Sequence, residues 1–297
     1  MTRVGELPQF VRDLLASPPK AGEGVNLWLF RAARILHACR TETEILDTLR
    51  AVTVGCGRVV TEKEIRRAVE NSRGAAWRPG ESNSFRSAPL WPQVNQEQLQ
   101  AILQEGYELV DLWEDSPIRL DDNESHTEEI VDVLFPDNPL LCCGKSKSKF
   151  ATRPRKEWRH WHLSELQLIV PSPMIARTGL TQEGKESEHT LRNTGSRRFL
   201  VIEFDTGGIN EHAVLLRHLA EYAPMVITVH SGKKSLHGWF YCFGQPEARL
   251  EAFMRHAVTL GADKATWSRS QFVRMPDGTR DNGNRQTVYF FNPEVIR

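Results

Sequence analysis

The segment from Phe199 to Asp205 constrains the fold of this chain most strongly. Its sequence, Phe-Leu-Val-Ile-Glu-Phe-Asp, is apolar and rich in β-branched residues, which predicts a buried strand. Because side chains alternate along a strand, we expect Glu203 and Asp205 on one face and Phe204 on the other. Two carboxylates about 7 Å apart on one face repel each other unless a cation or a basic group lies between them. Hard oxygen ligands favour Mg²⁺ or Mn²⁺, whereas the alternative is a strand end whose acids face solvent.

After Asp205, the pattern predicts a helix over 210–222 that Asn210 caps, with core spacing at Leu215, Leu216, Leu219 and Tyr222. A second polar segment follows this helix. His230-Ser-Gly-Lys-Lys-Ser-Leu-His237 lies between the strand-like stretches 225–229 and 238–243. Its glycine N–H group, its two hydroxyls and its two lysines, Lys233 and Lys234, suit a phosphate chain, although a Gly-Lys-Lys turn is also typical of a plain solvated hairpin. His237 lies among apolar residues, where an unpaired imidazole would be costly to bury. The chain contains no G-x-x-x-x-G-K-[ST] motif.

A third acid comes after the next helix. The pattern predicts a helix over 247–260 that ends at Gly261, which places Asp263 where a strand-edge ligand could lie. Asp277 and Asp281 are alternatives, but Pro276-Asp-Gly-Thr is typical of a turn.

Together these segments resemble the archaeo-eukaryotic primase superfamily, in particular the primase-polymerases of phages, plasmids and mobile elements. Acid-x-acid at Glu203 and Asp205 matches its first motif, Ser235 and His237 its second, and Asp263 its third. The resemblance spans about residues 90–297, and the family commonly has aspartate at the position of Glu203. It implies that Glu203, Asp205 and Asp263 bind two divalent metals. It also implies that the incoming nucleotide is held by His237, Ser235, Lys233 and Arg274, the last of these within a segment that resembles the family's R-x-P-G sequence.

The chain is neutral in total, with 38 basic and 38 acidic residues, but its charges are unevenly distributed. Residues 91–135 hold twelve acids and one base, whereas 145–160 hold seven bases and one acid. Lysines and arginines bind backbone phosphates and aromatic rings stack on bases, so the second segment predicts a single-stranded DNA contact, the alternative being a solvated charged face. The residues predicted for this contact are Lys145, Lys147, Lys149, Arg153, Arg155 and Trp158.

The first 78 residues form a different kind of sequence. Trp28, Ala32, Ile35, Leu36 and Cys39 have helical spacing, and Thr41-x-x-Glu44 and Thr61-x-x-Glu64 predict capping boxes that begin two more helices. We therefore expect a helical accessory domain over 1–78, a linker over 79–90 and a catalytic domain over 91–297. The resemblance implies an α+β, RRM-like core in the catalytic domain. DNA contact, helicase docking and help at primer initiation are all compatible roles for the helical domain.

These patterns predict a DNA primase-polymerase that transfers nucleotides from (d)NTPs onto a primer on a single-stranded template. The chain has no helicase motif, so a separate replicative helicase is an expected partner. It also has no apolar run of membrane-spanning length, no signal peptide and no C-x-x-C pair, and we expect a cytoplasmic location without membrane contact. Two alternatives are a catalytically silent single-stranded nucleic-acid-binding module and a replication-initiator endonuclease. The latter needs a His-hydrophobe-His pair, and His230 and His237 are too far apart in sequence to form one.

Overall fold

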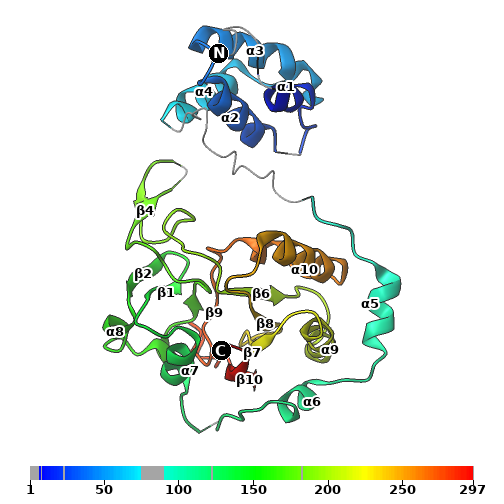
Figure 1. Cartoon of the computed structure of the whole chain (residues 1–297), viewed down its shortest axis with the longest axis vertical. Coiled ribbons are helices and arrows are strands. Elements are labelled where there is room, and N and C mark those ends of the chain that lie inside the picture. Colours follow the sequence, from blue (N-terminus) through cyan, green and yellow to red (C-terminus); the bar gives the residue numbers. More distant parts are fainter. Residues whose placement is uncertain are drawn as a thin grey trace. The chain divides into compact units, whose positions relative to one another are not determined.

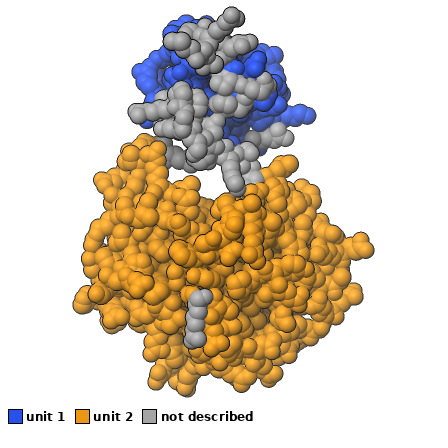
Figure 2. Space-filling model, in the orientation of Figure 1, with its two compact units in different colours: residues 1–88 blue, residues 89–297 orange. Residues whose placement is uncertain are grey.

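The chain divides into two compact units, residues 1–88 and 89–297, which Figure 2 shows in different colours. The computed structural model describes residues 7, 9–22, 24–74, 90–121, 123–181 and 183–296. Most of the predicted linker 79–90 therefore lies outside the described residues. No helix in the described ranges is long and apolar enough to cross a membrane.

The first unit is helical (Figure 1). Its elements are α1 (Gln9–Ala16), α2 (Val25–Leu36), α3 (Glu42–Thr53), η1 (Val54–Cys56) and α4 (Glu62–Arg73). Both predicted capping boxes are present, since Thr41 and Thr61 each exchange hydrogen bonds with the glutamate three residues later. The interior gathers Trp28, Leu29, Ile45, Leu49, Ile65 and Val69. The prediction that the helix extends to Cys39 is wrong, because α2 ends at Leu36 and the Cys39 side chain is exposed.

The second unit is an α+β fold with two four-stranded antiparallel sheets and one small hairpin (Figure 1). The first sheet has the order β2-β1-β3-β9 and consists of β1 (Leu140–Ser146), β2 (Lys149–Pro154), β3 (Leu168–Ile169) and β9 (Val273–Arg274). The second has the order β10-β7-β8-β6 and consists of β6 (Phe199–Glu203), β7 (Met225–His230), β8 (Leu236–Tyr241) and β10 (Val288–Phe291). The hairpin pairs β4 (Gly179–Leu180) with β5 (Glu186–Ser187).

The helices of this unit are α5 (Gln96–Leu103), α6 (Leu109–Glu114), α7 (Thr127–Leu134), α8 (Arg155–Trp158), α9 (Ile209–Ala220) and α10 (Glu247–Thr259). Short 3₁₀ turns are η2 (Leu163–Glu165), η3 (Lys264–Trp267) and η4 (Pro293–Ile296). Strand β8 lies between β6 and β7, while β10 pairs with β7 and so closes the other edge. The RRM-like core implied by the resemblance stays a prediction.

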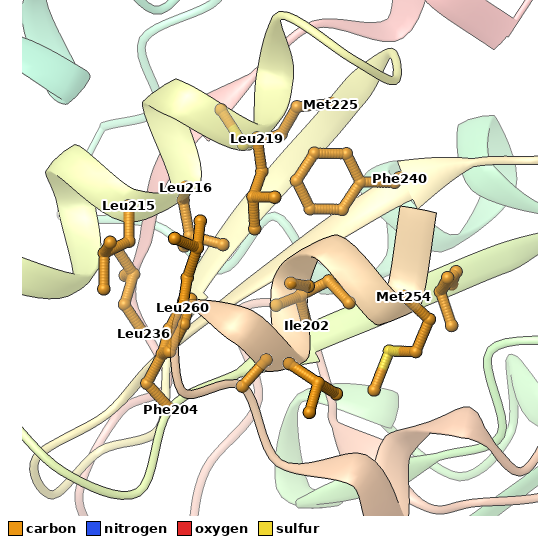
Figure 3. Close-up of a cluster of buried hydrophobic side chains, with 14 of the residues drawn as sticks. Ile202, Phe204, Leu215, Leu216, Leu219, Met225, Leu236, Phe240, Met254 and Leu260 are labelled. Atoms are coloured by element: carbon orange, nitrogen blue, oxygen red, sulfur yellow. The ribbon is translucent and has the colours of Figure 1, made fainter. Parts of the chain in front are cut away.

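Alternation along β6 produces two separate cores. Leu200, Ile202 and Phe204 face α9 and α10, and Figure 3 shows Ile202 and Phe204 among side chains from both helices. Phe199 and Val201 face the other way, into a core shared with α7 and the first sheet. Close approach of α9 depends on Gly238, since a Cβ there would lie 2.5 Å from Leu216 Cδ2. Glu203 therefore points toward the side of the sheet on which the first sheet lies.

Helix α9 begins earlier than the sequence suggested. Asn210 is not its cap, because the carboxylate of Glu211 accepts a hydrogen bond from the Gly208 N–H group at 2.7 Å and Ile209 is already helical. Asn210 instead accepts a hydrogen bond from the N–H group of Leu109. Tyr222, predicted to face the core, lies beyond the helix end and is 54% exposed.

Two predicted DNA-contacting residues are buried, which corrects the prediction for them. Arg155 is 2% exposed, and its guanidinium lies 2.5 Å from Glu128 Oε2 and 2.8 Å from Asp132 Oδ1, both on α7. Trp158 is also buried, and its indole N–H donates a hydrogen bond to the carbonyl of Leu141. A buried arginine needs a partner for its charge, so the acids of α7 determine where this residue lies.

We expect the double variant Glu128→Gln/Asp132→Asn to lose about 3 kcal/mol of unfolding free energy, because it leaves the buried Arg155 charge without a counter-charge. Urea denaturation followed by circular dichroism measures this. The matched control is Glu129→Gln on the same helix, whose side chain is 84% exposed. It should change the unfolding free energy by less than about 0.5 kcal/mol. Equal stability of the double variant and the control would contradict a structural role for Arg155.

Candidate active site

The centre of the site is a cross-strand pair. Strands β6 and β8 are antiparallel with Glu203 opposite His237, and both side chains project to the side of the sheet that faces the first sheet. Glu203 Oε2 lies 3.0 Å from His237 Nδ1. The histidine side chain is 5% exposed and the glutamate side chain 22% exposed. A carboxylate on the neighbouring strand thus lies beside the buried imidazole, although the angles of this contact do not make it a hydrogen bond.

Charged neighbours determine the ionisation of Glu203. Burial raises the pKa of its carboxyl group, but the contact with His237 and the positive charges of Arg274 and Lys147 together lower the pKa below its ordinary value. The carboxylate is therefore ionised at neutral pH even though it is largely enclosed. Lys147 belongs to the turn between β1 and β2, and Arg274 to β9, so cations from the first sheet act on an acid of the second.

Asp263 joins Glu203 through the backbone. Its N–H group donates a hydrogen bond to the Glu203 carbonyl at 2.9 Å, and Ala262 forms a β-bridge with Phe204. The turn at Gly261, with a φ of 97°, returns the chain from α10 to this edge. The Asp263 carboxylate accepts the N–H group of Ala265 at 2.9 Å and so begins η3.

Asp205 lies two residues beyond Glu203 and is exposed. The three predicted acids therefore lie on two adjoining segments at one end of β6. Among the described residues, no group of three or more Asp, Glu, His or Cys side chains has an arrangement that would hold a metal ion. The metal triad stays a prediction.

The turn between β7 and β8 is stabilised by hydrogen bonds among its own residues. The Ser231 hydroxyl accepts hydrogen bonds from the N–H groups of Lys234 and Ser235, and Gly232 has a φ of 72°. The Ser235 hydroxyl lies 3.4 Å from His237 Nε2, so the predicted pair is together. Lys233 and Lys234 are both exposed, and Lys234 donates a hydrogen bond to the carbonyl of Asp205 at 2.9 Å. The sequence predicts that both lysines suit a phosphate, and the resemblance implies Lys233 for the nucleotide. The contact of Lys234 with Asp205 was missed, because a Lys-Lys pair in a turn carries no signal for which side chain bonds a neighbouring segment.

Arg274 is half-buried and held in place. Its guanidinium donates a hydrogen bond to Gln167 Oε1 at 3.1 Å, and burial followed by the charge of Arg280 lowers its pKa. Gln167 was not predicted. This side chain is 7% exposed and donates a hydrogen bond to the carbonyl of Lys145, so it links Arg274 to the β1–β2 hairpin.

His212 is a further buried residue that sequence reasoning missed. Its Nε2 contacts the Thr206 carbonyl at 2.8 Å, and its Nδ1 accepts the N–H group of Leu236 at 3.3 Å. It thereby fixes the segment after β6 to the start of β8. Its position on the inward face of the predicted helix was the available signal.

The predicted DNA-binding run is divided by the fold. Lys145, Lys147 and Lys149 are exposed on the β1–β2 hairpin. The guanidinium of Arg153 lies over the ring of Trp161 at 4.9 Å and near the carboxylate of Glu157 at 3.9 Å. Arg155 and Trp158 belong to the interior, as described above. The basic surface is therefore smaller than the sequence count suggested.

Comparison with known proteins adds little to this geometry. No protein family matches the chain, and no curated protein matches it. One solved structure that matches is the AEP domain of the cyanophage S-2L primase-polymerase (PrimPol), at 13% sequence identity and a TM-score of 0.37. The match covers 57% of this chain and 92% of that one. At this TM-score the likeness carries no argument about the function of this chain.

We expect His237→Ala to raise the pKa of Glu203, because burial then acts without its largest compensating contact. In the wild type the lowered pKa stabilises the fold above the unfolded-state pKa, and this contribution is lost as pH falls through the folded-state pKa. In the variant the Glu203 contribution should weaken or change sign. Carboxyl ¹³C NMR titration of both proteins measures the shift, and an unchanged Glu203 pKa would show that the contact with His237 has no electrostatic weight.

Proposed function

We propose that the chain is a DNA primase-polymerase that transfers nucleotides from (d)NTPs onto a growing strand, directed by a single-stranded template and assisted by two divalent metal ions. The observation that carries this proposal is the meeting of Glu203 and Asp263. They lie sixty positions apart in the sequence, yet a backbone hydrogen bond joins them, and Asp205 lies two residues beyond Glu203. Cationic Arg274 and Lys147 act on the same carboxylate from the other sheet. Adjacent acidic and basic groups suit a reaction that needs both metal ions and phosphates.

The donor chemistry at this edge fits Mg²⁺ or Mn²⁺. All three proposed ligands, Glu203, Asp205 and Asp263, are carboxylates, and a carboxylate that makes one contact keeps a second oxygen. Glu203 contacts His237 through Oε2, so its Oε1 would be the oxygen that it offers to a metal. The bound ions would polarise phosphoryl oxygen and stabilise the charge of the leaving pyrophosphate.

The chain's own basic groups would hold the nucleotide. Arg274 is oriented by Gln167, and a guanidinium fixed in this way can pair bidentately with phosphate oxygens. Once released from Glu203, His237 would present Nδ1 to the same charge, with Ser235 close to its other nitrogen. Lys233 lies on the exposed turn and would add a third positive charge.

The exposed lysines of the β1–β2 hairpin are the proposed contact with the single-stranded template. They are Lys145, Lys147 and Lys149, with Arg153 beside them. Because the chain carries no helicase motif, we also propose that a separate replicative helicase opens the duplex. The proposed cellular location is the cytoplasm.

We expect Asp205→Asn to abolish primer extension while leaving single-stranded DNA binding nearly intact, because it removes a metal-binding charge and no template contact. Gel analysis of extension in Mg²⁺ or Mn²⁺, together with fluorescence anisotropy for DNA binding, measures both. Asp137→Asn is the matched control. Asp137 is exposed with a φ of 67°, a conformation that asparagine also adopts readily, so this variant should extend at the wild-type rate.

Extension at the wild-type rate by Asp205→Asn would contradict the assignment. Absence of metal-dependent incorporation by the wild type would instead favour the catalytically silent binding module. The closed contact between Glu203 and His237 is the observation that supports this second candidate.

We expect Arg274→Ala to raise the KM for dNTP about ten- to hundredfold, because one charge-assisted contact contributes on the order of 1.5–3 kcal/mol. Steady-state extension at varied dNTP measures this value. Arg249→Ala is the control, since Arg249 is exposed on α10 and its guanidinium donates a hydrogen bond to the side chain of Gln245, just before the helix. An equal KM for dNTP in the two variants would contradict a contact between Arg274 and the nucleotide and would leave Arg274 with a structural role only.

A further inference from the structure

Two histidines meet on the helical layer, away from the proposed active site. His218 on α9 and His256 on α10 place their Nε2 atoms 3.2 Å apart. The ring centroids are 5.3 Å apart and the planes are inclined by 56°. The residues are thirty-eight positions apart in sequence, so the packing of two helices, and no local turn, brings the nitrogens together.

The pair is open on one side. The ring of Tyr222 packs against both imidazoles, at 5.2 Å from His218 and 4.7 Å from His256. A cavity of about 360 Å³ lies beside them and is lined by Tyr222 and His256 together with Phe253 and Arg249. Both histidines are partly exposed, and the cavity reaches the pair from the His256 side.

The protonation of the pair suits a cation. A hydrogen bond between two Nε2 atoms needs one of them to carry a proton and the other to accept it, so at least one imidazole is neutral. Burial, and then the charge of His218, lowers the pKa of His256. Neutral imidazole is the form that binds metals.

The distance between the nitrogens matches chelation. Zinc binds histidine nitrogen at about 2.0–2.1 Å in tetrahedral geometry, which places two ligating nitrogens roughly 3.3 Å apart. The Nε2 separation in this pair is 3.2 Å. Two imidazoles from different helices, already at this spacing, need little rearrangement to hold one ion.

We propose that His218 and His256 form a binding site for a borderline transition-metal ion such as Zn²⁺ or Ni²⁺, with one Nε2 from each as ligands. Water completes the coordination, because in the described part of the chain no third Asp, Glu, His or Cys side chain joins the pair in a ligand set. When both imidazoles are neutral, the Nε2 proton of the donating ring transfers to its Nδ1 through solvent and no net proton is released; a protonated donating ring releases its Nε2 proton to solvent. Imidazole selects these ions over Mg²⁺, which prefers oxygen.

This site is separate from the carboxylates proposed for catalysis. Helices α9 and α10 cover the face of the second sheet that carries Leu200 and Ile202, whereas Glu203 points to the opposite face. A bound ion would join α9 to α10, and α10 leads directly into Asp263.

The test is thermal unfolding of the full chain with and without Ni²⁺, which is preferred to Cu²⁺ because the chain has five free cysteines. We expect saturating Ni²⁺ to raise Tm by roughly 5 °C, since ligands that bind only the folded state stabilise it. His218→Ala and His256→Ala should each lose this shift. His160→Ala, which removes an exposed histidine elsewhere, should retain it.

Asp205→Asn should also retain the shift, which separates this site from the proposed catalytic metals. Histidine modification by diethyl pyrocarbonate, mapped by mass spectrometry, tests the wild type directly, because Ni²⁺ should protect His218 and His256 and leave His160 reactive. The proposal is overturned if the wild type shows no Tm shift, if the shift survives in His218→Ala, or if Ni²⁺ protects neither histidine.

Discussion

The pairing of β6 with β8 is the constraint on which the rest of the site depends. Its register places Glu203 opposite His237, and its alternation sends both side chains toward the first sheet. The carbonyl of Glu203 then receives the N–H group of Asp263, so one strand end organises groups from three parts of the sequence. A slip of one residue would turn Glu203 toward α9 and α10, where no counter-charge from the first sheet exists. The hydrophobic side chains on both faces of β6 therefore fix the electrostatics of the site.

Much of this arrangement follows from local patterns. The strand at Phe199, the α10 helix and both threonine capping boxes were predictable, because periodicity and caps act over a few residues. What the sequence did not reveal depends on distant partners. Arg155 and Trp158 belong to a run that looks like a DNA-binding surface, but the acids of α7 and the carbonyl of Leu141 draw them inside. Two contacts were missed for the same reason. They are the hydrogen bond of Lys234 to Asp205 and that of Arg274 to Gln167, each of which joins separate parts of the sequence.

The uneven distribution of charge along the chain is explained by ion pairs between α7 and the segment around α8. The acidic segment 91–135 and the basic segment 145–160 meet where α7 contacts α8, and Asp132 serves both Arg155 and Arg159. Opposite charges far apart in the sequence therefore neutralise each other in the fold. The cations left exposed are concentrated on the β1–β2 hairpin, so a count along the sequence overestimates the surface that remains for an anionic ligand.

The base of the β1–β2 hairpin is buried, whereas the lysines toward its tip are exposed. Arg155 and Trp158 secure its base to α7 and β1, while Lys147 lies at its tip beside Glu203. Substitutions at the tip change the charge near the site without disturbing the buried base. Affinity for an anionic ligand and stability of the fold thus reside in different residues of one hairpin. Natural selection can adjust the first over many generations while leaving the second untouched.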